Sequence, residues 1–253
     1  MAGSAEALLS AQGLIKDFGG LRVLDGLDLS LGAGELLVLV GPNGCGKTTF
    51  FNILSGGLKP TAGEIRFAGQ SIGGLPPHAV ARLGMLRKFQ VPSVYPSLSV
   101  AENLRIPLCA RRGAGGLSGL LGEAAAQRKE AQGLLAEVRL WDKRDEAAGS
   151  LSHGEKQWLE IALVLASRPR LMLLDEPTAG MTFAEAEATV DLIARLHRQR
   201  GLAAIVIEHD MAVVELLNCP VAAMVKGAIV AQGSFAQVRD DPQVRAHYLG
   251  SAA

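Results

Sequence analysis

A glycine-rich segment near the start of the chain has the residue types and spacing needed to surround phosphate groups. It fits the pattern G-x-x-x-x-G-K-S/T, in which backbone N–H groups point at the phosphates of a bound nucleotide. The pattern is matched by Gly41, Pro42, Asn43, Gly44, Cys45, Gly46, Lys47, Thr48 and Thr49. On its own this segment predicts a nucleotide site and does not say what is done with the nucleotide.

The residues on either side predict the secondary structure that such a loop requires. Glu35–Val40 is a short apolar run bounded by glycine, which is typical of a buried strand in a parallel sheet. After the loop, apolar residues recur at helical spacing at Phe50, Phe51, Ile53 and Leu54. We therefore expect a strand, the loop and a helix in that order, with the helix N-terminus facing the anion.

Composition narrows the class of protein. The 253 residues suffice for one large domain or two small ones. Lys+Arg and Asp+Glu both number 25, so the net charge is +0 and no nucleic-acid partner is expected. No apolar run reaches the roughly 18 residues that span a bilayer, and residues 1–10 lack a signal-peptide pattern. Cys45, Cys109 and Cys219 have no metal-ligand spacing and favour a reducing, cytoplasmic setting.

Three short segments around the loop, residues 8–15, 23–31 and 63–69, are separated by turns and predict antiparallel strands. From about residue 76 to 166 the composition becomes helical, with an apolar stripe in 124–140. We expect an α/β fold: a phosphate-loop core with a parallel sheet, an N-terminal antiparallel β subdomain and an inserted α-helical subdomain. The core and β subdomain take about 1–84 and 167–253, and the helical subdomain about 85–166.

Two further strands are predicted to deliver polar side chains to one edge of the core. Four apolar residues, 171–174, precede Asp175 and Glu176, and the buried run 203–207 precedes His209. Ligands of open α/β sheets bind at the carboxyl ends of the strands, so these side chains are candidates for the site. A helix over 185–200, short strands in 221–231 and a closing helix over 235–249 complete the expected elements.

Two more stretches complete the set of motifs. Arg87-Lys88-Phe89-Gln90 follows the loop, and Leu151–Glu155 opens a helix, with Ser152 as the N-cap and Glu155 at capping-box spacing. With these motifs in this order, the chain resembles the ATP-binding subunit of ABC transporters over nearly its whole length. The resemblance makes 151–155 the signature motif, Gln90 the glutamine loop, His209 the switch histidine and 179–182 the dimer-contact loop.

The resemblance implies a role for each candidate residue, with ATP and Mg²⁺ as cofactors. Lys47 would hold the β- and γ-phosphates, and Mg²⁺ would be held by Thr48, Gln90 and Asp175. Glu176 would be the general base for the attacking water, His209 would contact the γ-phosphate, and Gln90 would be a third catalytic residue. Phe18 lies where the family has an aromatic residue stacked on adenine, and the alternative is a core phenylalanine.

The resemblance also implies partners. Ser152 and Gly154 would cap ATP held by a second ATP-binding subunit, in a head-to-tail homodimer or heterodimer. Transmembrane permease subunits and, indirectly, a solute-binding protein would complete the system, with this chain on the cytoplasmic face of the membrane. Residues 151–161 look like the urea-type importers, and 246–250 like the wider group that imports branched-chain amino acids.

Three alternatives stay open at this point. One is the ATPase of an exporter such as a lipopolysaccharide-type system, and another is a non-transport ABC ATPase. A third is a binding module that dimerises without turnover, against which Glu176 argues.

Three residues depart from the family pattern: His153 in the signature motif, Thr182 in the dimer-contact loop and Cys45 in the phosphate loop. A thiol at a helix N-terminus beside Lys47 is expected to have a lowered pKa. We therefore expect alkylation of Cys45 to block ATP hydrolysis.

Overall fold

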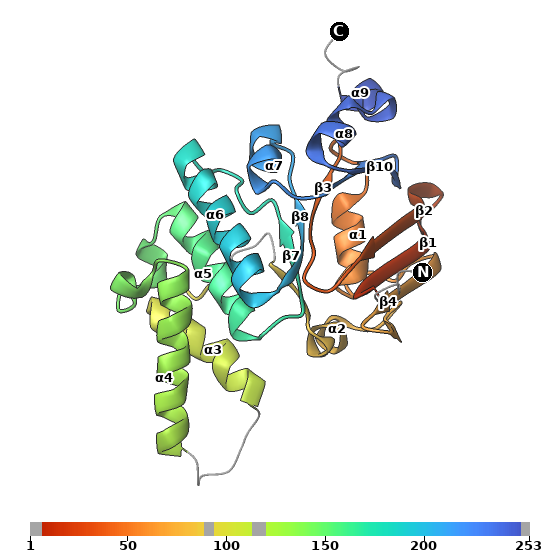
Figure 1. Ribbon diagram of the computed structural model, residues 1–253. Helices are drawn as coiled ribbons and strands as arrows, with labels where there is room; N and C mark the ends of the chain where they lie inside the picture. Colours follow the sequence, from red (N-terminus) through yellow and green to blue (C-terminus); the bar gives the residue numbers. More distant parts are fainter. Residues whose placement is uncertain (1–6, 89–93, 113–119, 249–253) are drawn as a thin grey trace, which may run out of the picture. The chain divides into compact units, whose positions relative to one another are not determined.

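The computed structural model describes residues 7–88, 94–112 and 120–248 (Figure 1). The chain divides into two compact units. The first unit contains Met1–Arg87, Arg170–Pro177 and Ile193–Ala253. The second contains Lys88–Pro169 and Thr178–Leu192, so it includes a segment beyond the range 85–166.

The first unit is built on a six-stranded sheet that confirms the expected parallel core. The strand order is β10 (Ala228–Gly233), β9 (Val221–Val225), β3 (Leu36–Val40), β8 (Ala203–Ile207), β7 (Leu171–Asp175) and β6 (Met85–Lys88). β3 pairs in parallel with β8 and β9, and β7 pairs in parallel with β8. Every residue of β3, β7, β8 and β9 is buried, because both faces of the sheet are covered and the strands are continuous apolar runs.

The same unit contains the expected antiparallel sheet. Its order is β2 (Leu21–Leu31), β1 (Leu9–Phe18), β4 (Ala62–Phe67) and β5 (Gln70–Ser71). Helix α1 (Lys47–Leu54) lies between the two sheets, and its apolar side chains join both in one core (Figure 1). The phosphate loop is therefore anchored on both sides by buried apolar packing.

The remaining helices of this unit are short. They are α2 (Pro77–Leu83), α7 (Met211–Leu217), α8 (Phe235–Asp240) and α9 (Pro242–Tyr248). The single closing helix expected over 235–249 is wrong, since two helices occupy this range. Asp241 has extended backbone angles because it precedes Pro242, and proline disfavours the helical conformation in the residue before it.

The second unit is helical. It contains α3 (Val100–Arg112), α4 (Leu120–Glu137), α5 (His153–Ala166) and the first part of α6 (Phe183–Arg200), with short 3₁₀ turns at Trp141–Lys143 and Ala148–Ser150. The expected helix 124–140 ends earlier, at Glu137, because Arg139 adopts the left-handed conformation that terminates helices. Among the described helices, none has the length and apolar character to cross a membrane.

Candidate functional site

The phosphate loop connects β3 to α1, and two glycines give it its shape. A Cβ at Gly41 would lie 2.4 Å from the Met224 carbonyl oxygen, so the backbone approach there requires glycine. Gly46, the N-cap of α1, has φ of 112°, a left-handed conformation that side chains disfavour. The loop can therefore turn tightly into the helix and direct its N–H groups inward.

The N-terminus of α1 has no side-chain cap. Gly46 makes no capping side-chain bond, and the first turn contains no acidic residue. The first N–H groups of a helix have no partner within it, and the helix dipole is positive at this end. The backbone of α1 is thus arranged to receive an anion.

The Lys47 ammonium is folded into this loop. The side chain is 7% exposed, and Nζ donates to the Gly41 carbonyl at 2.6 Å and the Pro42 carbonyl at 3.1 Å. The cation is therefore held against the backbone at the start of the phosphate loop.

Two carboxylates stand at the same edge of the sheet. β3, β8 and β7 are neighbours and parallel, so their carboxyl ends meet. Asp175 ends β7, and Glu176 follows in a left-handed conformation with φ of 46°. The Glu176 N–H donates to the Ile207 carbonyl at 3.0 Å, which holds that conformation in place. A non-glycine residue in this region costs about 1–3 kcal/mol, and such residues cluster at functional sites.

His209 meets Glu176 at this edge. It follows β8, and its Nδ1 lies 3.7 Å from Glu176 Oε1. The His209 side chain is 56% exposed and that of Glu176 31%, so both can reach a bound molecule. The structure therefore brings together two residues that are 33 positions apart, as expected for ends of adjacent strands.

Asp175 is buried and paired. Its Oδ2 accepts from Arg87 Nη2 at 2.6 Å, and the two side chains are 2% and 6% exposed. The sequence did not identify this partner, since nothing in it says which carboxylate a buried arginine will meet.

The oxygen donors fit Mg²⁺. Thr48 is exposed in the first turn of α1, and Asp175 supplies a carboxylate. Mg²⁺ keeps several waters and takes one or two protein oxygens together with substrate phosphates. In the part of the chain that the structure describes, no cluster of three His, Cys, Asp or Glu could hold a metal ion alone. Thr48 and Asp175 thus supply one or two protein oxygens of the kind that Mg²⁺ takes. Gln90 lies outside the described residues.

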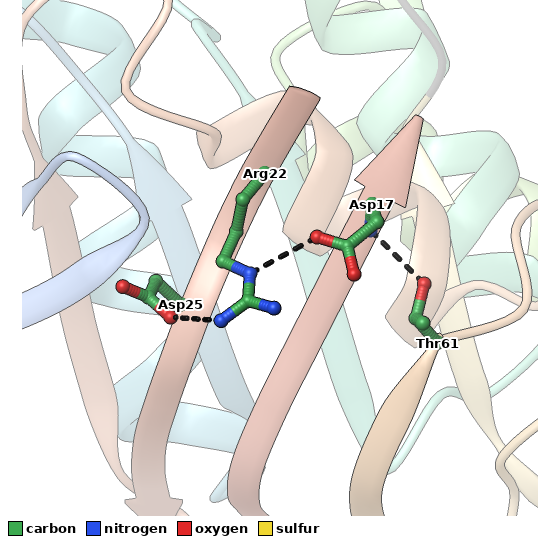
Figure 2. Close-up of polar contacts among 4 residues, drawn as sticks. All are labelled: Asp17, Arg22, Asp25 and Thr61. Atoms are coloured by element: carbon green, nitrogen blue, oxygen red, sulfur yellow. Dashed lines mark hydrogen bonds and ion pairs between the residues drawn. The ribbon is translucent and has the colours of Figure 1, made fainter. Parts of the chain in front are cut away.

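Phe18 ends β1, at the turn into β2. Its side chain is 43% exposed, which excludes the alternative of a core phenylalanine, and Lys16 Nζ lies 4.9 Å from the ring centroid. Arg22 bonds Asp17 and Asp25, each at 3.1 Å, and the Asp17 N–H donates to Thr61 Oγ1 at 3.0 Å. Figure 2 shows these contacts. These bonds stabilise the end of the β1–β2 hairpin next to the exposed Phe18 ring.

The signature segment lies in the helical unit and begins α5. Ser152 and Glu155 form the expected capping box: Ser152 Oγ accepts from the Glu155 N–H at 3.3 Å, and Glu155 Oε2 accepts from the Ser152 N–H at 3.0 Å. Burial raises the pKa of Glu155, but bonds from Lys143, 2.7 Å away, and from Ser152 outweigh this and lower it. Gly154 is buried in the first turn of α5. A Cβ added at this position would lie 3.3 Å from Glu185 Oε1.

Two of the three residues that depart from the family pattern, His153 and Thr182, have hydrogen-bond partners within the helical unit. His153 Nε2 lies 3.0 Å from the Ala179 carbonyl oxygen, so it joins the signature helix to the 179–182 loop. Thr182 forms a capping box at the start of α6, with its N–H donating to Glu185 at 2.9 Å and its hydroxyl accepting from the Glu185 N–H at 3.4 Å. The T-x-x-E spacing was present in the sequence and could have identified this cap.

The expectation of a lowered Cys45 pKa is wrong. The side chain is 5% exposed, and burial raises the pKa of the thiol more than Lys47, 3.9 Å away, lowers it. The helix terminus and the lysine favour the thiolate, but the loss of water around the sulfur is the larger effect.

Alkylation is therefore expected to begin at Cys109, which is exposed, and to be slow at Cys45 and Cys219. Burial raises the pKa of Cys219 to about 11, so about one thiol in a thousand is ionised at pH 8. Because both pKa values are raised, the rates at Cys45 and Cys219 should increase with pH. Peptide mass spectrometry after iodoacetamide treatment at pH 7.5 and 9 measures this. Labelling of Cys45 as fast as Cys109 at pH 7.5 would contradict the burial argument.

A phosphate loop on a parallel sheet, with Asp-Glu and His at the ends of adjacent strands, defines a phosphate-loop nucleotide-binding domain. Residues 24–179 match the ABC transporter family, and residues 228–253 match a family described as branched-chain amino acid ATP-binding cassette transporter. The chain therefore belongs to the ABC transporter family, as an ATP-binding transport ATPase.

Similar proteins agree in sequence and structure. The chain is 37% identical to the high-affinity branched-chain amino acid transport ATP-binding protein BraF of Pseudomonas aeruginosa, over 97% of this chain and 98% of BraF. It is 35% identical to LivG of Escherichia coli K12, described in the same words, over 98% of this chain and 100% of LivG. The ADP conformation of MJ1267, an ATP-binding cassette of an ABC transporter, superposes with a TM-score of 0.83 at 27% identity, covering 96% of this chain and 99% of that one.

Proposed function

We propose that this chain hydrolyses ATP to drive the import of a branched-chain or other hydrophobic amino acid, or of urea, through membrane permease subunits. The observation that carries the catalytic part is the Glu176–His209 pair at the carboxyl edge of the sheet. That edge is also where β3 enters the phosphate loop.

The residues of the first unit have separate roles in binding and hydrolysing ATP. The loop N–H groups and Lys47 hold the ATP phosphates, and Phe18 stacks on the adenine. Thr48 and Asp175 would hold Mg²⁺, which would neutralise charge at the phosphates, and the family resemblance adds Gln90 to this set. Glu176 accepts the proton of the attacking water, and His209 contacts the γ-phosphate. The geometry supports these roles through the proximity of Glu176 and His209 and the uncapped start of α1.

The second unit acts on a different nucleotide. Ser152 and Gly154, at the N-terminus of α5, cap ATP bound by a second ATP-binding subunit in a head-to-tail homodimer or heterodimer. Closure of this dimer would be coupled to the permease subunits through the region near Gln90. The chain would then lie on the cytoplasmic face of the cell membrane, with a solute-binding protein delivering the solute.

The choice of solute rests on relatives and not on this site. BraF and LivG are named for branched-chain amino acids, and the match over 228–253 supports the same group. The signature residues 151–161 favour the urea type. Another relative, SsuB 1 of Rhizobium johnstonii, is named for aliphatic sulfonates and is 38% identical over 82% of this chain.

The test is ATP hydrolysis by this chain in proteoliposomes with its co-purifying permease subunits and solute-binding protein. We expect leucine or urea to stimulate phosphate release, with an alkanesulfonate as the matched negative control. Stimulation by the sulfonate alone would overturn the proposed solute. Hydrolysis without any solute-dependent uptake would favour an exporter or a non-transport ATPase.

A further inference from the structure

Arg87 lies in the interior of the nucleotide-binding unit and is held by two different elements. Its Nη2 donates to Asp175 Oδ2 at 2.6 Å, at the end of β7. Its Nη1 donates to Asn52 Oδ1, on α1, and its guanidinium carbon lies 5.5 Å from the Phe51 ring centroid. The planar guanidinium fork fixes the direction of both bonds, which a lysine ammonium cannot do.

The bond to α1 reaches the helix face that carries Thr48. Residues four positions apart are neighbours on one helix face, so Asn52 stands one turn below Thr48. Arg87 therefore contacts both elements that carry the side chains proposed to hold Mg²⁺: Asp175 at the end of β7 directly, and α1, which carries Thr48, through Asn52.

We propose that Arg87 is a positioning residue that fixes the Asp175 carboxylate against α1 and thereby sets the affinity for Mg²⁺ bound with ATP. This inference rests on the proposed function, in which Thr48 and Asp175 hold the ion. A carboxylate has lone pairs for several donors, so the pairing of Oδ2 with Arg87 leaves acceptor capacity for a water on the metal.

The burial of Arg87 indicates that its role is to orient Asp175 and not to stabilise the fold. The side chain is 6% exposed, and Arg87 Nε is buried without a hydrogen-bond partner in the described part of the chain. Leaving a buried donor unpaired is unfavourable, and a buried ion pair is weak evidence for stability. Partners that orient metal-binding carboxylates typically change metal affinity by about 10- to 100-fold when they are replaced.

The experiment is a Mg²⁺ titration of the whole protein in the presence of a fluorescent ATP analogue. We expect Arg87→Met to raise the half-saturating Mg²⁺ concentration about tenfold. Binding of the analogue in EDTA, which depends on the phosphate loop, should stay near the wild-type value. Arg87→Lys keeps the charge but cannot bond both partners, so it should recover only part of the loss.

Lys88→Met is the matched control. Lys88 is the next residue, its Nζ lies 3.5 Å from Glu160 Oε2, and both side chains are buried within the helical unit. This variant also removes a buried cation, but its half-saturating Mg²⁺ concentration should match the wild type. An equal shift in Lys88→Met, or none in Arg87→Met, would overturn the inference.

Two further outcomes are informative. Tighter Mg²⁺ binding by Arg87→Met would mean that the guanidinium competes with the ion, which also overturns the inference. If urea denaturation shows that Arg87→Met is not folded, Asn52→Ala replaces it. This variant keeps the ion pair, breaks the link to α1 and should shift the Mg²⁺ requirement in the same direction. An absence of Mg²⁺-dependent binding in the wild type would contradict the proposed function itself.

Discussion

Replacing Glu176 with glutamine is expected to reduce ATP hydrolysis at least about 100-fold, since general bases typically contribute 10²- to 10⁴-fold. Glutamine keeps the shape of the side chain but cannot accept the proton of the attacking water. The left-handed backbone at residue 176 and the N–H bond to Ile207 do not involve the carboxylate. The variant should therefore fold normally and bind ATP with wild-type affinity. Phosphate release and titration with a fluorescent ATP analogue measure the two properties separately.

The variant should also accumulate as an ATP-bound dimer, because closure would no longer be followed by hydrolysis. Size-exclusion chromatography with and without ATP detects this. Glu187→Gln is a suitable control, since Glu187 is an exposed acid on α6 and its neutralisation should leave hydrolysis unchanged. Unchanged turnover in Glu176→Gln would place the base elsewhere in the chain.

Much of this site could be predicted from local sequence. The runs 171–174 and 203–207 are continuously apolar, and strands buried on both faces require that composition. Because parallel strands end at one edge, knowing that Glu176 and His209 each follow such a run was enough to place them together. The capping box of Ser152 and Glu155 was equally local, since both partners lie within one helical turn.

Properties set by tertiary burial were not predictable in this way. For Cys45, the helix N-terminus and Lys47 are visible in the sequence, but the desolvation that raises the thiol pKa depends on packing around the sulfur. Arg87 was visible only as part of a motif. That it bonds Asp175, 88 residues later, follows from the neighbouring positions of β6 and β7, which sequence periodicity does not specify. Local sequence thus identified the residues of the site, whereas their burial and their hydrogen-bond partners depend on the tertiary structure.

Replacing Lys47 with alanine is expected to weaken ATP binding about 100-fold or more. Lys47 would bond both the β- and the γ-phosphate, each hydrogen bond to a charged group is worth about 1.5–3 kcal/mol, and tenfold in affinity is about 1.4 kcal/mol. The ammonium also bonds the Gly41 and Pro42 carbonyls. The variant should therefore be less stable even without nucleotide, and lost activity alone would not distinguish the two effects.

The difference in unfolding free energy with and without ATP does distinguish them. At an ATP concentration 100 times its wild-type Kd, binding should stabilise the wild type by about 2.7 kcal/mol and Lys47→Ala by about 0.4 kcal/mol or less. Urea denaturation of each protein with and without Mg-ATP measures this difference. Lys59→Ala removes an exposed lysine of the same unit and should retain the full stabilisation. An equal gain in Lys47→Ala would mean that the backbone of the loop and the start of α1 bind the phosphates without the ammonium, which would confine the role of Lys47 to holding the Gly41 and Pro42 carbonyls.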